Sequence, residues 1–156
     1  MARNEVGFIF DLDGTLVDSV YPLPGALPLL EYLTRTGIPW AVATSGNLDV
    51  ARANLELLGV EPQAVPVITR DDVKRAKPDP DLFLAAADRL HVDVASAAII
   101  GDSIWDMLAA RRAHGLGVGV LSGGYGQDEL ERAGAIRVYE DPADLLRHID
   151  EIGGRA

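Results

Sequence analysis

The chain has 156 residues, 48% of them hydrophobic and 24% charged, which suits one soluble globular domain with its own core, and we expect a single domain over 1–156. The absence of cysteine excludes disulfides, thiolate catalysis and zinc–sulfur sites, and the net charge of −10 argues against nucleic acid as the main partner, because phosphate backbones are bound by clustered Lys and Arg. No apolar run approaches the roughly 20 residues needed to span a bilayer, and the N-terminal residues 1–8 contain no apolar signal region, so we expect a cytoplasmic protein without a membrane partner.

Apolar runs of strand length alternate with amphipathic stretches of helix length along the chain. We predict strands at residues 6–10, 39–44, 65–68, 97–102 and 118–122, with a weaker one at 136–140. We predict helices at residues 25–35, 47–58, 80–90, 104–114, 126–133 and 142–151. This alternation is typical of a doubly wound α/β domain with a parallel sheet, in which ligands bind outside the carboxyl ends of the strands.

The first predicted strand ends in two aspartates, Asp11 and Asp13, followed by Gly14. Strand alternation points both carboxylates the same way, and the glycine allows a sharp turn after them. A carboxylate can attack phosphorus to form an aspartyl phosphate, and a neighbouring carboxyl group can protonate the leaving group and then activate water. This strand end is therefore a candidate reaction centre.

The second strand ends at Thr44-Ser45-Gly46-Asn47. Hydroxyl and backbone N–H groups at a helix entrance can seat a phosphate, although the same residue types also serve as helix N-caps. Lys77 precedes the next long helix, and Pro78 fixes an extended backbone there, so its ammonium group can be aimed at a fixed point. Taken alone, this lysine can equally be an ordinary surface residue.

A later buried strand ends in Asp102, and Asp106 follows on the same side of the first turn of a helix. Acids at this position can also simply complement the helix dipole. Asp11, Asp13 and Asp102 would meet at one edge of the sheet, where unpaired carboxylates repel one another unless a cation holds them. Oxygen ligands favour a hard ion, and we predict Mg²⁺. We expect the adjacent Trp105 to be a packed aromatic residue on this helix rather than a substrate contact.

Together and in this order, these features resemble the haloacid dehalogenase-like (HAD) hydrolase superfamily, in its phosphoglucomutase-like and phosphoglycolate-phosphatase-like branch. The first motif of that superfamily matches residues 11–15, the second the strand end at Thr44, the third Lys77-Pro78, and the fourth residues 101–106. The resemblance implies a three-layer, Rossmann-like, doubly wound parallel sheet. It also implies an Mg²⁺-dependent phosphomonoester hydrolase that acts through an aspartyl-phosphate intermediate on a phosphorylated small molecule or macromolecule.

The resemblance further implies a role for each matching acid. Asp11 would be the nucleophile and a metal ligand. Asp13 would be the general acid/base, with its backbone carbonyl on the metal. Asp102 would be the third protein ligand of Mg²⁺, and Asp106 would orient metal-bound water or Lys77.

The remaining matches concern the phosphoryl group. Thr44 would hydrogen-bond its oxygens, with Ser45 beside it, and Lys77 would neutralise the charge that it shares with Asp11. Dehalogenases resemble this chain less well, because they generally lack an acid at the position of Asp13.

Members of the superfamily usually carry a cap domain between the first and second motifs or between the second and third. Here Asp11 to Thr44 and Thr44 to Lys77 are both 33 positions apart, which leaves no room for one, and we expect an open site without a cap. Residues 16–19 resemble the run that enters a helical cap, and residues 21–33 the run that leaves it. The apolar junction residues Val20, Tyr21 and Leu23 are a candidate homodimer contact.

Other functions stay open at this point. A core without its cap can be a catalytically weak scaffold or binding module, because the cap carries much of the substrate recognition. A receiver-like regulator phosphorylated on Asp11 is disfavoured by Asp13 and Asp106, which suit turnover. A phosphomutase is also disfavoured, because it must keep its intermediate from water.

Overall fold

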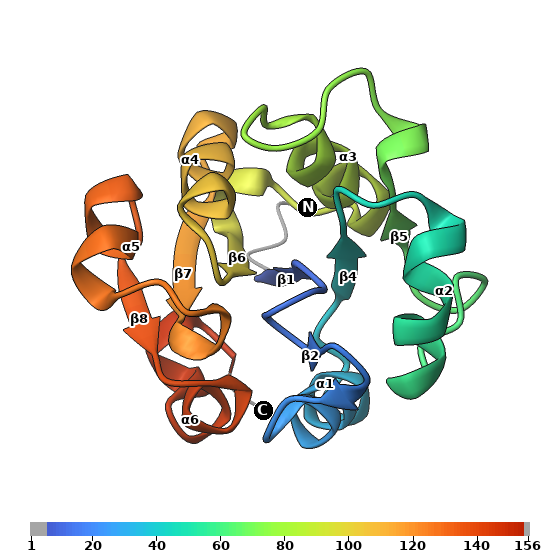
Figure 1. Ribbon diagram of the computed structural model, residues 1–156, viewed down its shortest axis with the longest axis horizontal. Coiled ribbons are helices and arrows are strands. Elements are labelled where there is room, and N and C mark those ends of the chain that lie inside the picture. Colours follow the sequence, from blue (N-terminus) through green and yellow to red (C-terminus); the bar gives the residue numbers. More distant parts are fainter. Residues whose placement is uncertain (1–5, 155–156) are drawn as a thin grey trace.

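The computed structural model describes residues 6–154 as a sheet between two layers of helices (Figure 1). The sheet has the strand order β5-β4-β1-β6-β7-β8, and all neighbouring strands in it are parallel. Its strands are β1 (Gly7–Phe10), β4 (Trp40–Ala43), β5 (Val67–Ile68), β6 (Ala97–Gly101), β7 (Leu116–Val120) and β8 (Arg137–Tyr139). The α-helices are α1 (Ala26–Arg35), α2 (Leu48–Leu57), α3 (Asp81–Leu90), α4 (Ile104–Ala113), α5 (Gln127–Ala133) and α6 (Pro142–Arg147).

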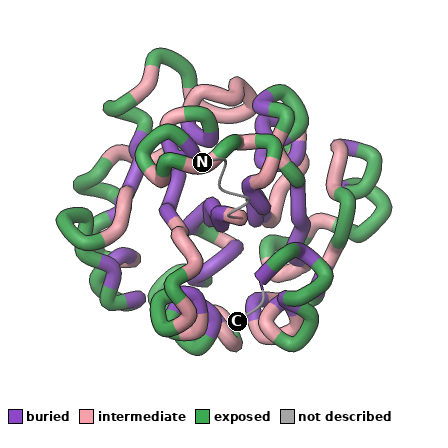
Figure 2. The backbone as a smooth tube through the Cα atoms, turned by 180° about the vertical axis from the view of Figure 1, so that it is seen from behind, coloured by how far each residue is buried: buried purple, intermediate pink, exposed green. Residues whose placement is uncertain are grey.

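The side chains of β1 alternate between two cores, as a period of two residues requires. Phe8 and Phe10 pack with α1, α2 and α6 on one face of the sheet, while Ile9 packs with α3 and α4 on the other. Helix α5 packs on α4 through Met107 and Leu130. Figure 2 shows the central strands buried and the outer sides of the helices exposed. The predicted three-layer, doubly wound α/β fold is confirmed.

The register between the two central strands, β1 and β6, determines which residues meet at the carboxyl ends of these strands. Phe10 of β1 lies beside Ile100 of β6, and the backbone N–H of Asp11 continues the ladder by donating to the carbonyl of Ile100 over 2.9 Å. The carboxyl ends of β1 and β6 therefore bring Asp11 and Asp102 to the same edge of the sheet.

Residues 12–22, in which the sequence predicted no strand or helix, have a structure of their own. The N–H groups of Leu16 and Val17 both donate to the carbonyl of Leu12, which closes a turn directly after β1. The chain then forms a short antiparallel hairpin of β2 (Val17–Asp18) and β3 (Tyr21–Pro22). Strands of two residues carry too little alternation to be predicted from sequence.

The hairpin leads straight into α1, and α2, β5 and a 3-10 turn at Arg70–Asp72 fill most of the interval before Lys77. The described chain between Asp11 and Lys77 thus contains no inserted domain. Of the junction residues expected to form an apolar contact, Val20 and Tyr21 are 62% and 72% exposed, whereas Leu23 is half-buried. The exposed apolar patch is therefore smaller than the sequence suggested.

Several other boundaries differ from the prediction. Strand β7 begins at Leu116, and the residues after it form a 3-10 turn at Leu121–Gly123. The glycines inside β7 are not breakers: a Cβ added to Gly117 would lie 3.3 Å from the sulfur of Met107, so the missing side chain lets α4 approach the sheet. The last predicted helix is broken at His148 into α6 and a 3-10 turn at Ile149–Ile152.

None of the helices within residues 6–154 has the length and apolar character that crossing a membrane would require.

Candidate active site

A pocket of about 340 Å³ opens at the carboxyl ends of β1, β4 and β6. The residues that the sequence singled out all line it: Asp11, Asp13, Thr44, Ser45, Lys77, Asp102 and Asp106. Ligands bind at this edge in doubly wound sheets because successive strands deliver their following loops to the same place. The structure thus brings together residues that are up to 95 positions apart in the chain.

Lys77 lies at the base of this pocket, and only 5% of its side chain is exposed. Its Nζ donates to Asp11 Oδ1 at 2.7 Å and to the carbonyl of Ala43 at 3.0 Å, and it is 2.9 Å from Asp106 Oδ1. Burial disfavours the charged ammonium group, but the two carboxylates outweigh this effect, and the pKa of Lys77 lies above its ordinary value. The alternative of an ordinary surface lysine is wrong.

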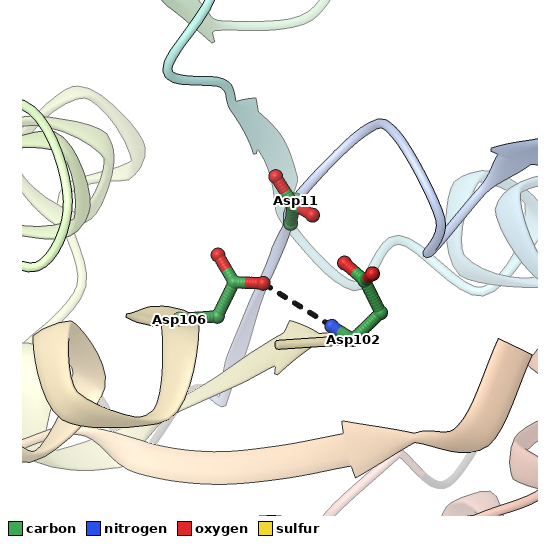
Figure 3. Close-up of side chains that lie close together, drawn as sticks. All are labelled: Asp11, Asp102 and Asp106. Atoms are coloured by element: carbon green, nitrogen blue, oxygen red, sulfur yellow. Dashed lines mark hydrogen bonds between the residues drawn. The ribbon is translucent and has the colours of Figure 1, made fainter. Parts of the chain in front are cut away.

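The carboxylates of Asp11, Asp102 and Asp106 lie close together in the pocket (Figure 3), and Asp11 and Asp106 contact Lys77. Asp11, Asp102 and Asp106 each offer one oxygen, and these oxygens lie within 4.8 Å of one another. Burial raises the pKa of Asp11 from 3.8 to about 6, against the opposing effect of Lys77. Burial is also the main reason why the pKa values of Asp102 and Asp106 are raised. The site has more negative charge than Lys77 can balance, and its donors are all oxygen, so it fits a hard divalent cation such as Mg²⁺.

The hydroxyl of Thr15 lies between two of these acids, 3.2 Å from Asp11 Oδ2 and 3.2 Å from Asp102 Oδ1. Asp106 Oδ2 accepts from the backbone N–H groups of Asp102 and Ser103 and from the hydroxyl of Ser103, at 3.0–3.3 Å. The serine and Asp106 form the capping box at the start of α4. The sequence of this helix start therefore fixes the acid that contacts Lys77.

Asp13 differs from the other acids, because β1 ends at Phe10 and Asp13 already belongs to the following turn. Strand alternation therefore does not set the direction of Asp13, although both acids line the pocket as expected; Asp11 is buried and Asp13 is exposed. The Nδ2 of Asn54 on α2 donates to Asp13 Oδ1 over 2.7 Å. The carboxylate of Asp13 is not part of the described group of three acids, and the resemblance implied a metal contact through its backbone carbonyl rather than its carboxylate.

The loop after β4 forms the other wall of the pocket. Thr44 is buried, and its Oγ1 accepts from the backbone N–H of Gly46 over 3.2 Å. Asn47 caps α2 by accepting from the backbone N–H of Val50 over 2.8 Å. The capping role thus falls on Asn47, while Thr44 and Ser45 line the pocket.

Two contacts from the loop after β7 complete the site. The Oγ of Ser122 donates to the carbonyl of Gly14 over 2.7 Å, which holds the turn that carries Asp13. A Cβ on Gly14 or on Gly123 would overlap the carboxylate of Asp102, so both positions must lack a side chain.

Sequence reasoning missed several of these residues. Ser122 follows a strand end, which is a signal that could have found it. Asn54 lies in the middle of α2, where no local pattern marks it. The expectation for Trp105 was wrong: it is 49% exposed and lines the pocket instead of packing into the core.

The fold and the pocket define an α/β domain with a carboxylate and lysine centre at the ends of parallel strands. The model of the haloacid dehalogenase-like hydrolases matches residues 17–114, which is more than half of the chain. A hydrolase from Pseudomonas syringae, known from its crystal structure, matches with a TM-score of 0.93 and 40% identity over 96% of this chain and 100% of that chain. The protein belongs to the haloacid dehalogenase-like hydrolase family.

Curated relatives carry the names of phosphatases. A phosphoglycolate phosphatase from Rhodospirillum rubrum is 39% identical over 127 residues, which cover 81% of this chain and 52% of that protein. Hexitol phosphatase A from Escherichia coli K12 is 37% identical over 92 residues, which cover 59% of this chain and 42% of that protein. The chain thus spans about half the length of the curated relatives it matches.

Proposed function

We propose that this protein hydrolyses phosphate monoesters through an aspartyl phosphate formed on Asp11. The observation that carries this proposal is the position of Asp11, a buried carboxylate 2.7 Å from the ammonium group of Lys77 in an open pocket. The phosphatase names of the relatives support the same class of reaction.

In the first step an oxygen of Asp11 attacks the phosphorus atom. The bond between phosphorus and the leaving-group oxygen breaks, and Asp13 gives its proton to that oxygen. In the second step Asp13 takes a proton from water while the water oxygen attacks the phosphorus, and inorganic phosphate leaves Asp11. Because the pKa of Asp11 is about 6, its carboxylate is mostly ionised, and so nucleophilic, at neutral pH.

The remaining residues act by charge and position. Phosphoryl transfer spreads negative charge over the equatorial oxygens of phosphorus, and preorganised donors stabilise that charge. Lys77 is held by Asp106 and by the carbonyl of Ala43, so its ammonium group is fixed beside Asp11. Thr44 and Ser45 stand on the wall of the pocket as donors to the phosphoryl oxygens.

The donor set also supports Mg²⁺ as the cofactor. Asp11, Asp102 and the backbone carbonyl of Asp13 would hold the ion, and Asp106 would act through its bonds to Lys77 and to the N–H of Asp102. When bound, the ion supplies positive charge that offsets the carboxylates and the phosphoryl oxygens. The chain offers no inserted domain between Asp11 and Lys77 to exclude water, which favours hydrolysis over transfer to a second substrate.

The test is hydrolysis of p-nitrophenyl phosphate by the whole chain with Mg²⁺. Chelation with EDTA should abolish turnover, and Asp11→Asn should lower kcat by at least about a thousandfold, because the nucleophile is lost. Asp88→Asn is the matched control, since Asp88 is exposed near the far end of α3. Turnover that persists in Asp11→Asn would refute the aspartyl-phosphate route. Binding of Mg²⁺ and phosphate without turnover on any phosphate ester would favour the scaffold alternative.

A further inference from the structure

The first turn of α4 places two neighbouring side chains in different parts of the pocket. Asp106 is 2% exposed and contacts Lys77, whereas Trp105 is 49% exposed. Among the described residues that line the pocket, Trp105 is the one aromatic side chain. A half-exposed tryptophan beside a site of buried acids offers a flat apolar surface that no core residue covers.

A second apolar side chain lies on the opposite side of Asp11. Helix α2 follows β4 and helix α4 follows β6, and these two strands flank β1, so the two helices lie on either side of the end of β1, which Asp11 follows (Figure 1). Val50 of α2 is 67% exposed, and its Cγ1 would lie 3.6 Å from a Cβ on Gly46, which lines the pocket. Trp105 thus lines the pocket, and Val50 lies beside one of its lining residues, Gly46.

The charges of the pocket limit what the leaving group can be. Lys77 is the one cationic residue among the described residues that line it, against the carboxylates of Asp11, Asp13, Asp102 and Asp106. The ammonium group of Lys77 has three protons, and it already faces Asp11, Asp106 and the carbonyl of Ala43. A carboxylate in the leaving group would find no cationic partner on the wall and would meet like charges.

We propose that the substrates of this site are phosphate monoesters whose leaving group is uncharged and flat or ring-shaped, and that Trp105 determines this preference by stacking against it. The inference rests on the proposed phosphatase function and adds the substrate class to it. It also sets the chain apart from the relative named for phosphoglycolate, because phosphoglycolate carries a carboxylate in its leaving group.

Non-hydrolysable phosphonates test the preference by binding alone, in the presence of Mg²⁺. Phenylphosphonate should bind about three- to tenfold more tightly than methylphosphonate, the range that aromatic contacts provide. Phosphonoacetate, which carries a carboxylate, should bind more weakly than either. In Trp105→Ala the advantage of phenylphosphonate should disappear, and Trp105→Phe should restore part of it.

Trp40→Phe is the matched control, because Trp40 begins β4 at the end of the sheet opposite to the site and donates its Nε1–H to Thr34. Its preference should equal that of the unchanged chain. This variant also leaves Trp105 as the only tryptophan of the two in the sequence, so phenylphosphonate should quench its fluorescence and methylphosphonate should not. An unchanged ratio of the two affinities in Trp105→Ala would overturn the proposal.

Measurements of turnover distinguish a failure of this inference from a failure of the proposed phosphatase function on which it rests. The ratio of kcat/KM for phenyl phosphate to that for glycerol 3-phosphate, whose leaving group is uncharged but acyclic, and for phosphoglycolate is compared between the unchanged chain and Trp105→Ala, so that intrinsic leaving-group reactivity cancels. A fall in the phenyl ratio by about three- to tenfold is expected. If the chain hydrolyses the esters and Trp105→Ala keeps the ratios, the substrate class is wrong while the phosphatase function stands. If the chain hydrolyses none of them, the phosphatase function fails.

Discussion

Single residues decide the electrostatics of this site. Asp11 and Asp106 share one ammonium group, and Asp102 lies within reach of both acids. Replacing any one partner changes the charge that the others must tolerate in a buried place. The residues around Asp11 therefore act as one unit, and their mutational effects should not be additive.

The metal-free protein should be destabilised by ionisation of Asp11. The folded-state pKa of about 6 lies above the ordinary 3.8, so the folded form holds the proton more tightly than the unfolded chain does. The stability linked to this proton is fully present below pH 3.8 and is lost as pH rises through about 6, at a cost of about 3 kcal/mol. In EDTA at about neutral pH, Asp11→Asn should therefore unfold at a higher temperature than the unchanged chain.

The pH profile supplies the control for this prediction. The advantage of Asp11→Asn should shrink as the pH falls toward 4, roughly the ordinary pKa of the group. Asp88→Asn, an exposed acid on α3, should show no such advantage at either pH. Equal unfolding temperatures for Asp11→Asn and the unchanged chain near neutral pH would show that Lys77 already compensates the buried charge.

Asn54 holds the carboxylate that the proposed mechanism uses as acid and base. Asn54→Ala removes the 2.7 Å hydrogen bond to Asp13 and should lower kcat by about tenfold or less with little change in KM, because Asp13 loses its fixed position while the phosphate contacts remain. Arg52→Ala is the control on the same helix, where Arg52 pairs with the exposed Asp49. Unchanged steady-state constants in Asn54→Ala would mean that this hydrogen bond does not position the acid.

At the scale of elements, the loop after β7 contacts the residues that form the site. Gly123 lies against the carboxylate of Asp102, and Ser122 bonds to the carbonyl of Gly14. Gly123→Ala should displace Asp102 and lower kcat/KM on the order of ten- to a hundredfold, with weaker Mg²⁺ binding by titration. Gly126→Ala in the same loop is the matched control, since its added Cβ would meet only Glu129, at 3.5 Å. Equal activity of the two variants would contradict this role for the loop.

Some of these elements could be predicted from the sequence and others could not, for physical reasons. The long buried strands and the helices α1 to α5 follow from apolar periodicity, and the strand-end rule brought Asp11, Thr44 and Asp102 to one edge. Lys77 follows no strand directly, and its place in the site came from the family resemblance. The hairpin escaped because its strands have two residues each. The contact of Asn54 with Asp13 escaped because it joins positions 41 apart, and the exposure of Trp105 because a helix start does not reveal which side faces solvent.

At the scale of the whole molecule, binding of Mg²⁺ should stabilise the fold. A ligand that binds only the folded state raises its stability with concentration, by about 2.7 kcal/mol at a hundred times Kd. Thermal unfolding with and without Mg²⁺ should show this gain in the unchanged chain, and a much smaller one in Asp102→Asn. Sodium at equal ionic strength is the control. An equal gain in Asp102→Asn would place the ion elsewhere.

The hairpin between β1 and α1 also has a use in protein engineering. Its exposed turn at Ser19 and Val20 lies outside the six-stranded sheet, and the strands on either side are paired to each other. Loop tips of this kind accept inserted domains, because the paired strands keep the two ends close together. A helical domain grafted at this turn would convert the open site into a covered one without altering any residue that lines it. Comparing the chain with and without this grafted domain would then show how much of the selectivity and turnover comes from the covering domain and how much from the residues that line the pocket.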